Sequence, residues 1–157
     1  MIRQFKFEGS DVKSDIMTKY PQTGELADIY SENLGAVVHK WHHYIPIYER
    51  YFNRFRDTPV RFLEIGVSKG GSLQIWRNYF GKSATIFGID IDPKCGGLNG
   101  QAGQVRIGSQ IDREFLQTVI HEMGGVDVIL DDGSHHMDHV GKTLEILFPL
   151  MTEGRYI

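Results

Sequence analysis

Apolar residues change their spacing near residue 59 of the chain. Before this point they recur every three or four positions, which favours amphipathic helices. After it, short apolar runs alternate with segments of helical spacing. The pattern predicts an N-terminal helical segment or lid over residues 1–58 and an α/β domain over residues 59–157.

Two helices are predicted in the N-terminal segment, after about ten poorly ordered residues. The first is expected to be capped by Thr23 and to stop at Gly35, and the second to start near Pro46, which suits a first turn. The buried positions are expected to be Leu26, Ile29, Tyr30 and Leu34 in the first helix, and Ile47, Tyr48, Tyr51, Phe52 and Phe55 in the second.

Strands and helices alternate in the second part. Strands are expected over 60–65, 85–89, 105–107 and 126–130. Helices are expected between them, with Gly81 and Gly124 as stops, and Asp112 is suited to cap the helix before Gly124. Such alternation implies right-handed crossovers and a doubly wound parallel sheet, an α/β fold.

The last predicted helix runs from about His136 to Leu150, and Gly154 is expected to turn the chain into the start of a fifth strand. Its buried side is expected to hold Val140, Leu144, Leu147 and Leu150. A fifth strand that is barely begun leaves the strand over 126–130 without a neighbour, although parallel strands are normally paired on both sides. We therefore expect an incomplete domain that is inactive as it stands and pairs its exposed edge in a homo-oligomer.

Composition narrows the possible partners. The 157 residues carry a net charge of −3, and the basic residues are scattered, so neither a nucleic acid nor a membrane is expected as a partner. No apolar run is long enough to span a bilayer, and the protein is expected to be cytoplasmic. The single cysteine, Cys95, excludes an internal disulfide.

A glycine-rich turn follows the first strand of the second part. The apolar run delivers Glu64 to the strand end, and glycines from Gly66 onward lead to Ser72, a small polar residue suited to open a helix. The spacing Glu-x-Gly-x-x-x-Gly differs from Gly-x-Gly-x-x-Gly, which favours S-adenosylmethionine over a dinucleotide. A tight turn that binds nothing has the same requirement for glycine.

The next two strand ends also carry polar groups. Asp90 is placed to accept hydrogen bonds from ribose hydroxyls, although a cap or a solvated acid is the alternative. Gln110, just after Ser109, is placed to read an adenine edge, and an ordinary loop glutamine is equally compatible.

The fourth strand ends in Asp131-Asp132-Gly133-Ser134-His135. Successive strand residues face opposite ways, so one acid is expected to face a cofactor and the other a metal or substrate. A helix cap is the alternative for one of them. His135 is suited to act as a general base near neutral pH, whereas His136 and His139 are expected on a helix surface.

From about Lys40 to Ile157 the sequence resembles class I S-adenosylmethionine-dependent methyltransferases. Two elements are similar to the macrocin and mycinamicin type of sugar O-methyltransferase: Asp-Asp-Gly-Ser-His at the fourth strand, and His-His-Tyr-x-x-x-Tyr-Glu over 42–49. The resemblance implies a Rossmann-like core, a magnesium ion, and a sugar or glycosylated small molecule as acceptor. Macrolide sugars, cell-surface glycans and other hydroxylated metabolites all stay open.

The resemblance also assigns roles to the residues singled out above. His135 takes the proton from the sugar hydroxyl, Asp132 is a ligand of Mg²⁺, and a Glu-Asp pair after strand five supplies further ligands beyond this chain. The cofactor is held by Glu64 and Gly66 at its methionine end, Asp90 at the ribose and Gln110 or Ser109 near the adenine, and Ser72 and Asp131 also lie at the cofactor.

Two alternatives come from other functional classes. The run from Ser134 to His139 is one residue short of the His-x-His-x-Asp-His signature of metallo-β-lactamase-like enzymes, which would make the protein a metal-dependent hydrolase. A non-catalytic module that only holds the cofactor is the second alternative. Upstream, the run from Lys40 to Tyr44 forms either a lid over a pocket or a packed linker.

Overall fold

A computed structural model of the chain describes residues 23–157, apart from the side chains of residues 153–155. The expectation for the first ten residues lies outside this range. The described part contains a five-stranded sheet in the order β3-β2-β1-β4-β5, with every neighbouring pair parallel. The predicted doubly wound α/β fold is therefore confirmed. The strands are β1 (Arg61–Ile65), β2 (Thr85–Asp90), β3 (Gln104–Ile107), β4 (Val126–Asp131) and β5 (Met151–Tyr156).

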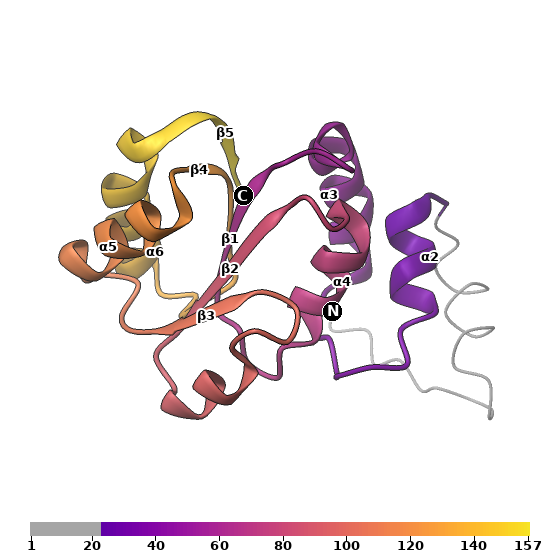
Figure 1. Cartoon of the computed structure of the whole chain (residues 1–157), viewed down its shortest axis with the longest axis horizontal. Coiled ribbons are helices and arrows are strands. Elements are labelled where there is room, and N and C mark those ends of the chain that lie inside the picture. The colour runs from indigo at the N-terminus through magenta and orange to yellow at the C-terminus, as the bar shows by residue number, and fades with distance from the viewer. Residues whose placement is uncertain (1–22) are drawn as a thin grey trace, which may run out of the picture.

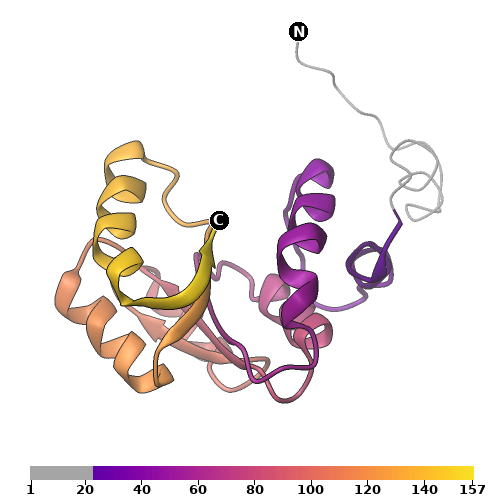
Figure 2. The same cartoon turned by 90° about the horizontal axis from the view of Figure 1, so that it is seen from above.

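Helices cover both faces of the sheet, as Figures 1 and 2 show. One face carries α5 (Arg113–Met123) and α6 (Met137–Leu147), and the other carries α4 (Gly71–Phe80), α3 (Ile45–Phe52) and α2 (Glu25–Ser31). Trp76 lies at the centre of the second layer, with its ring 5.6 Å from Phe52 and 5.3 Å from Phe62. The N-terminal helices thus share one apolar core with the sheet, and the boundary at residue 58 stays a prediction.

Helix α2 differs from the prediction at both ends. It ends at Ser31, and Leu34 is 99% exposed, so the expected burial of Leu34 and the stop at Gly35 are wrong. Thr23 does not cap it: the Leu26 N–H donates to Glu49 Oε2 at 2.9 Å. A carboxylate on α3 therefore satisfies this helix start, a long-range contact that local spacing does not reveal.

Helix α3 begins near Pro46 as predicted and lies between single 3₁₀ turns, η1 (His42–Tyr44) and η2 (Asn53–Phe55). Its buried side consists of Ile45, Tyr48 and Phe52. Ile47 and Tyr51 are 41% and 40% exposed, so their expected burial is wrong. The aromatic run wraps around the helix instead of lying on one side.

The last helix is shorter than predicted. Helix α6 ends at Leu147 and is followed by the 3₁₀ turn η4 (Phe148–Leu150). Its buried side consists of Thr143, Ile146 and Leu147, whereas Leu144 is 39% exposed and Val140 is only partly buried. The expected burial of Val140 and Leu144 is therefore wrong, because the buried stripe is rotated toward a threonine that hydrogen-bonds.

The fifth strand is longer than predicted. It starts at Met151, so the expected turn at Gly154 is wrong. It pairs with β4 from Val126–Met151 to Ile129–Tyr156, and the Asp131 N–H donates to the Ile157 carbonyl at 2.8 Å. The expectation that β4 lacks a neighbour is therefore wrong.

At the amino end of the sheet, Arg61 links β1 to β4. Its backbone N–H and its Nε both donate to Asp127 Oδ2 at 2.9 Å, and Nη2 pairs with Asp127 Oδ1 and reaches Thr152 Oγ1 at 3.1 Å. Nη1 donates to the Gly124 carbonyl. The Arg61 guanidinium holds the pKa of Asp127 below its usual value.

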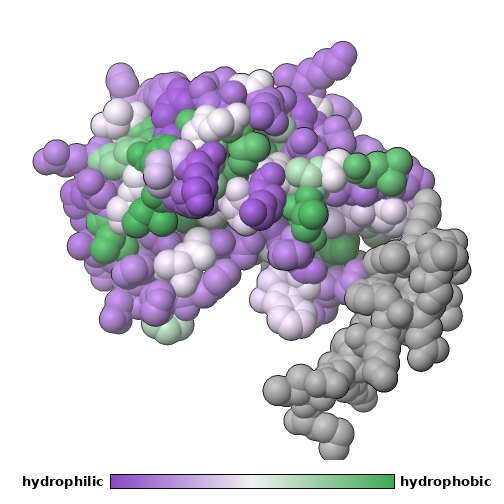
Figure 3. All heavy atoms as spheres, turned by 90° about the horizontal axis from the view of Figure 1, so that it is seen from below, coloured by the Kyte–Doolittle hydropathy of each residue, from purple (hydrophilic) through white to green (hydrophobic). Residues whose placement is uncertain are grey.

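The surface in Figure 3 is mostly hydrophilic, with hydrophobic residues in separate patches. Within residues 23–157, no helix has the length and apolar character needed to cross a membrane.

Candidate functional site

A cavity of about 650 Å³ lies at the carboxyl ends of the strands. Its walls come from residues 65–69 at the end of β1, 89–91 at the end of β2, 108–110 after β3 and 132–135 after β4, and from the N-terminal segment over 37–41. Ligands of doubly wound sheets bind at this end, and the volume suits a nucleotide-sized molecule. Six predicted site residues line it: Gly66, Ser72, Asp90 and Gln110, proposed for the cofactor, together with Asp132 and His135.

The glycine turn after β1 brings two strand ends into contact. Gly66 has a φ of 93°, and a Cβ there would overlap the carbonyl oxygen of Asp132. Gly70, with a φ of 78°, is the N-cap residue of α4. Glycine is therefore required at Gly66 both by the conformation of the turn and by the close approach of β4.

Asp90 organises the same turn. Its Oδ2 accepts hydrogen bonds from the Val67 and Ser68 N–H groups, and its Oδ1 accepts one from Asp92 N–H, each at 2.9 Å. Burial opposes ionisation of this carboxyl group, but the three backbone donors outweigh it and lower its pKa. Asp90 is thus an ionised group at the cavity wall.

Glu64 lies behind the wall. Its side chain is fully buried and does not line the cavity. Ser72 Oγ donates to Oε2 at 2.7 Å, and Lys40 Nζ donates to Oε1 at 3.1 Å. Burial raises the pKa of Glu64 against the opposing effects of Lys40 and Ser72. Glu64 therefore has no direct contact with the cavity, whereas its partners Ser72 and Lys40 line the wall.

The sequence did not identify Lys40 as a charged residue of the site. Its side chain is 4% exposed, and its Nζ pairs with Asp132 Oδ2 as well as Glu64. Burial lowers its pKa, but the two carboxylates outweigh this and raise it, so the ammonium stays charged. The two partners follow 24 and 92 residues later, and no spacing rule links them to a lysine in an aromatic run.

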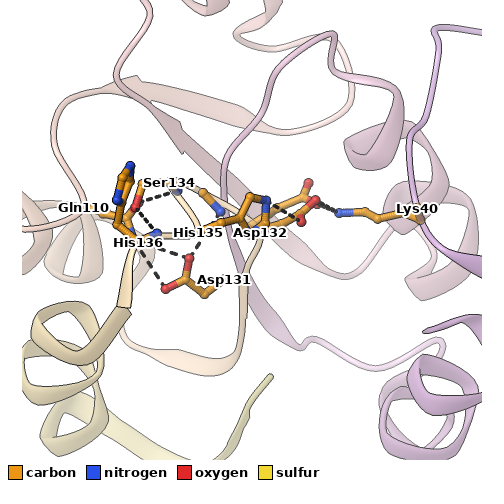
Figure 4. A network of polar contacts seen from close by, with 9 residues as sticks. Lys40, Gln110, Asp131, Asp132, Ser134, His135 and His136 are labelled. Carbon is orange, nitrogen blue, oxygen red and sulfur yellow. Dashed lines mark hydrogen bonds and ion pairs between the residues drawn. The ribbon is translucent and has the colours of Figure 1, made fainter. Parts of the chain in front are cut away.

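Asp131 and Asp132 turn to different partners, as Figure 4 shows. Asp132 meets Lys40, whereas Asp131 Oδ2 accepts a hydrogen bond from Tyr156 Oη at 2.8 Å. Asp131 also accepts from the Gly133 N–H and does not line the cavity. The predicted divergence of the two acids is confirmed, while a contact between Asp131 and a cofactor stays a prediction.

His135 lies at the cavity wall beside Asp132. Its Nε2 is 3.6 Å from Asp132 Oδ1, and its side chain is 72% exposed. Its φ of 56° is a strained backbone conformation for a residue with a side chain. Such strain persists where the surrounding structure imposes it, often at functional sites.

Gln110 ties the third strand end to the fourth. Its Oε1 accepts a hydrogen bond from Ser134 N–H at 2.8 Å, and its Nε2 donates to Thr143 Oγ1 at 3.1 Å. Ser134 Oγ lies 3.0 Å from His139 Nδ1, and His139 is a partly exposed residue of α6 that lines the cavity. His136 is exposed, as predicted.

Across residues 23–157, no three His, Cys, Asp or Glu side chains converge in a way that could hold a metal ion. Asp132 has one oxygen paired with Lys40. Magnesium takes six ligands in a near-octahedral arrangement, several of them often waters, and a single carboxylate does not define such a site. These residues do not form a magnesium site by themselves, and the ligand role of Asp132 stays a prediction.

No protein-family model matches the chain. It is 41% identical over 140 residues, 85% of its length, to the 8-demethyl-8-(2-methoxy-alpha-L-rhamnosyl)-tetracenomycin-C 3'-O-methyltransferase of Streptomyces olivaceus. It is 36% identical over 148 residues, 87% of its length, to the mycinamicin VI 2''-O-methyltransferase of Micromonospora griseorubida. The chain spans about a third of these curated relatives, 35% of each.

Solved structures give the same result. The MycE methyltransferase of the mycinamycin pathway, in complex with Mg and SAH, matches with a TM-score of 0.74 and 32% identity, over 86% of this chain and 39% of that one. A complex of MycE with Mg, SAH and mycinamycin VI also gives 0.74, at 27% identity over 94% and 44% of the two chains. The resemblance that the motifs predicted is confirmed in sequence and in fold.

Proposed function

We propose that this chain, a relative of the sugar O-methyltransferases, is the S-adenosylmethionine-binding core of an enzyme that methylates a hydroxyl group of a sugar or glycosylated small molecule. One observation carries the proposal: the cavity at the strand ends brings four predicted cofactor residues beside the Asp132–His135 pair. The relatives named for sugar O-methylation, and MycE solved with SAH and a macrolide, support it.

The cofactor lies across the strand ends in this proposal. The turn at Gly66 lets it approach the backbone, and Gln110 lies near its adenine. Asp90 holds the ribose from the cavity wall, where three backbone N–H groups fix the orientation of its carboxylate.

The reaction is an in-line displacement, so most of its catalysis is positioning. The sugar hydroxyl gives its proton to the imidazole of His135, the oxygen bonds to the methyl carbon, and the carbon–sulfur electron pair stays on sulfur. Because His135 Nε2 faces Asp132, Nδ1 is the nitrogen left to take the proton. Asp132 orients the ring and stabilises the imidazolium that forms.

Magnesium accompanies SAH in the MycE complexes. We propose Asp132 as one ligand in the whole protein, with the remaining ligands from outside residues 23–157. No step above depends on the metal.

The alternatives fare differently. The comparisons give no support to a metal-dependent hydrolase, and no cluster of metal-binding side chains is found in the part of the chain described. A non-catalytic module is separated from an enzyme by turnover, which the test below measures. A homo-oligomer remains part of the proposal, to be measured by light scattering.

The test is His135→Asn in the whole protein, with S-adenosylmethionine and a glycosylated acceptor. Asparagine tolerates the left-handed backbone at this position, so the fold is preserved. We expect kcat to fall about 10²–10⁴-fold, the usual contribution of a general base, while the affinity for SAH by calorimetry stays the same.

His136→Asn is the matched control. His136 is exposed and does not line the cavity, so this variant should keep wild-type kcat. Full turnover by the His135→Asn enzyme would remove His135 from the mechanism. Wild-type protein that binds SAH but methylates no glycosylated acceptor would favour the non-catalytic module.

A further inference from the structure

The geometry points to Lys40 as the residue that binds the carboxylate of the cofactor's methionine end, with Glu64 and Asp132 holding its ammonium in place. This inference rests on the proposed cofactor site and adds a residue that the sequence motif does not contain. It also changes the role of Glu64, from a direct ligand of the cofactor to the buried counter-ion of Lys40.

Glu64 is poorly placed to bind the cofactor itself. Its side chain is 0% exposed, and its two oxygens are occupied by Ser72 Oγ at 2.7 Å and Lys40 Nζ at 3.1 Å. A ligand in the cavity meets Ser72 and Lys40, which line the wall, before it meets this carboxylate. Glu64 therefore affects a bound ligand through Ser72 and Lys40, and not by direct contact.

Lys40 has a donor to spare. An ammonium carries three N–H donors, and two of them serve Glu64 and Asp132. With the lysine at the cavity wall, the third is left for a ligand that accepts hydrogen bonds. A carboxylate is the acceptor that gains most, because the attraction between opposite charges adds to the hydrogen bond.

The charges of the cluster also match this end of the cofactor. The Lys40 ammonium lies between the carboxyl groups of Glu64 and Asp132. S-adenosylmethionine carries an ammonium, a sulfonium and a carboxylate, and is positive by one. Lys40 suits the carboxylate, and the exposed part of Asp132, whose side chain is 29% exposed, suits the neighbouring cations.

The backbone that carries Lys40 is fixed before a ligand arrives. The Ala36 N–H donates to Gln74 Oε1 at 3.3 Å, and the Ala36 and Val37 carbonyl oxygens lie where a Cβ of Gly71 would be. The segment is thus packed against the first turn of α4. Little conformational entropy is lost when a ligand binds to an ammonium group that is already held in place.

The competing interpretation is that Lys40 only latches the N-terminal segment to the sheet. Two ligands separate the interpretations: SAH, and 5'-methylthioadenosine, which lacks the amino-acid end. In Lys40→Met we expect calorimetry to show about a tenfold or greater loss of affinity for SAH, the scale of one charged hydrogen bond, and unchanged affinity for 5'-methylthioadenosine. A latch alone predicts equal losses for the two ligands.

Three further variants complete the experiment. Lys40→Arg should keep most of the preference for SAH, since it keeps the charge and the donors. Lys69→Met removes an exposed ammonium from the same wall and should leave the ratio of the two affinities unchanged. If Lys40→Met does not fold, Lys40→Met/Glu64→Gln removes the stranded carboxylate, and the same selective loss is expected.

The outcomes are distinct. Wild-type protein that binds neither ligand overturns the proposed function together with this inference. Wild-type binding of both ligands, with an equal loss or no loss in the Lys40 variants, overturns only the inference. A selective loss in Lys69→Met instead would assign the carboxylate to Lys69.

Discussion

An ion pair lies at each end of the sheet, and the two pairs differ in whether the cation has a hydrogen-bond donor left over. At the amino end, Arg61 meets Asp127, and at the carboxyl end, Lys40 meets Glu64 and Asp132. The side-chain nitrogens of Arg61 are all spent on protein acceptors, namely Asp127, Thr152 and the Gly124 carbonyl. Lys40 keeps one of its donors.

Backbone conformation alone does not separate the two ends. The carboxyl end holds two residues with side chains at positive φ, Ser68 and His135, and the amino end holds Asp57, with a φ of 54°, just before β1. The close approach of the Gly66 backbone to Asp132 lies at the carboxyl end. The difference between the two ion pairs is therefore in their hydrogen-bond donors: those of Arg61 are satisfied within the protein, and one donor of Lys40 is not.

The largest expected difference between the two ends is in stability. Lys40→Met leaves Glu64 buried without a counter-ion and should lower the free energy of unfolding by about 3–5 kcal/mol. Arg61→Met should cost only about 1–2 kcal/mol, because Asp127 keeps its bonds from the Arg61 N–H and Thr152 and is partly exposed. Urea unfolding measures both, and equal costs would contradict the comparison.

A smaller effect is expected from the glycine that joins two strand ends. Gly66→Ala puts a Cβ against the backbone of Asp132 at a φ of 93° and should cost about 2–3 kcal/mol. Gly97→Ala is the control, since no atom lies within 4 Å of the Cβ it would add. Thermal unfolding should show a lower Tm for the first variant only; a wild-type Tm for Gly66→Ala would mean that the strand ends separate easily.

The smallest effect concerns pH at the amino end. The pKa of Asp127 is lower in the folded protein than in the unfolded chain, so its pairing stabilises the fold above the ordinary value near 3.9. This stabilisation is lost as the pH falls through the lower, folded-state pKa. Asp127→Asn should therefore cost about 1 kcal/mol at pH 7 and progressively less in that acidic window, as measured by urea unfolding.

Arg61→Met provides the control for this pH dependence. In that background Asp127→Asn should have little further effect, since both changes remove the same pair. An undiminished cost of Asp127→Asn at low pH would show that its charge is not what matters.

The sheet could be predicted from sequence because its signals are local. The apolar runs and glycine stops placed β1, α4 and α5 within a residue or two. The predicted bounds were wrong where a contact between distant residues determines the end of a helix or strand. Glu49 starts α2 in place of Thr23, and pairing with β4 extends β5 back to Met151. Neither contact leaves a local pattern.

The residues of the candidate site also fall into two groups: those that local sequence predicts and those that depend on distant contacts. Asp90, Gln110 and His135 lie at or just after strand ends, and the rule that ligands bind there placed them at one cavity. Lys40 precedes the sheet, and its partners depend on how the N-terminal segment packs against α4. A sequence motif also does not reveal burial. Glu64 occupies the position where the motif predicts a residue that binds the cofactor, yet its side chain is fully buried.

The Lys40–Asp132 pair also has a consequence for folding. The two residues are separated by 92 positions, so the contact closes a long loop and forms only after β4 has joined β1. Contacts of such sequence separation are slow to form compared with the local turns at Gly66 and Asp90. The part of the cavity at Gly66 and Asp90 is therefore built early, and the part at Lys40 and Asp132 is built last.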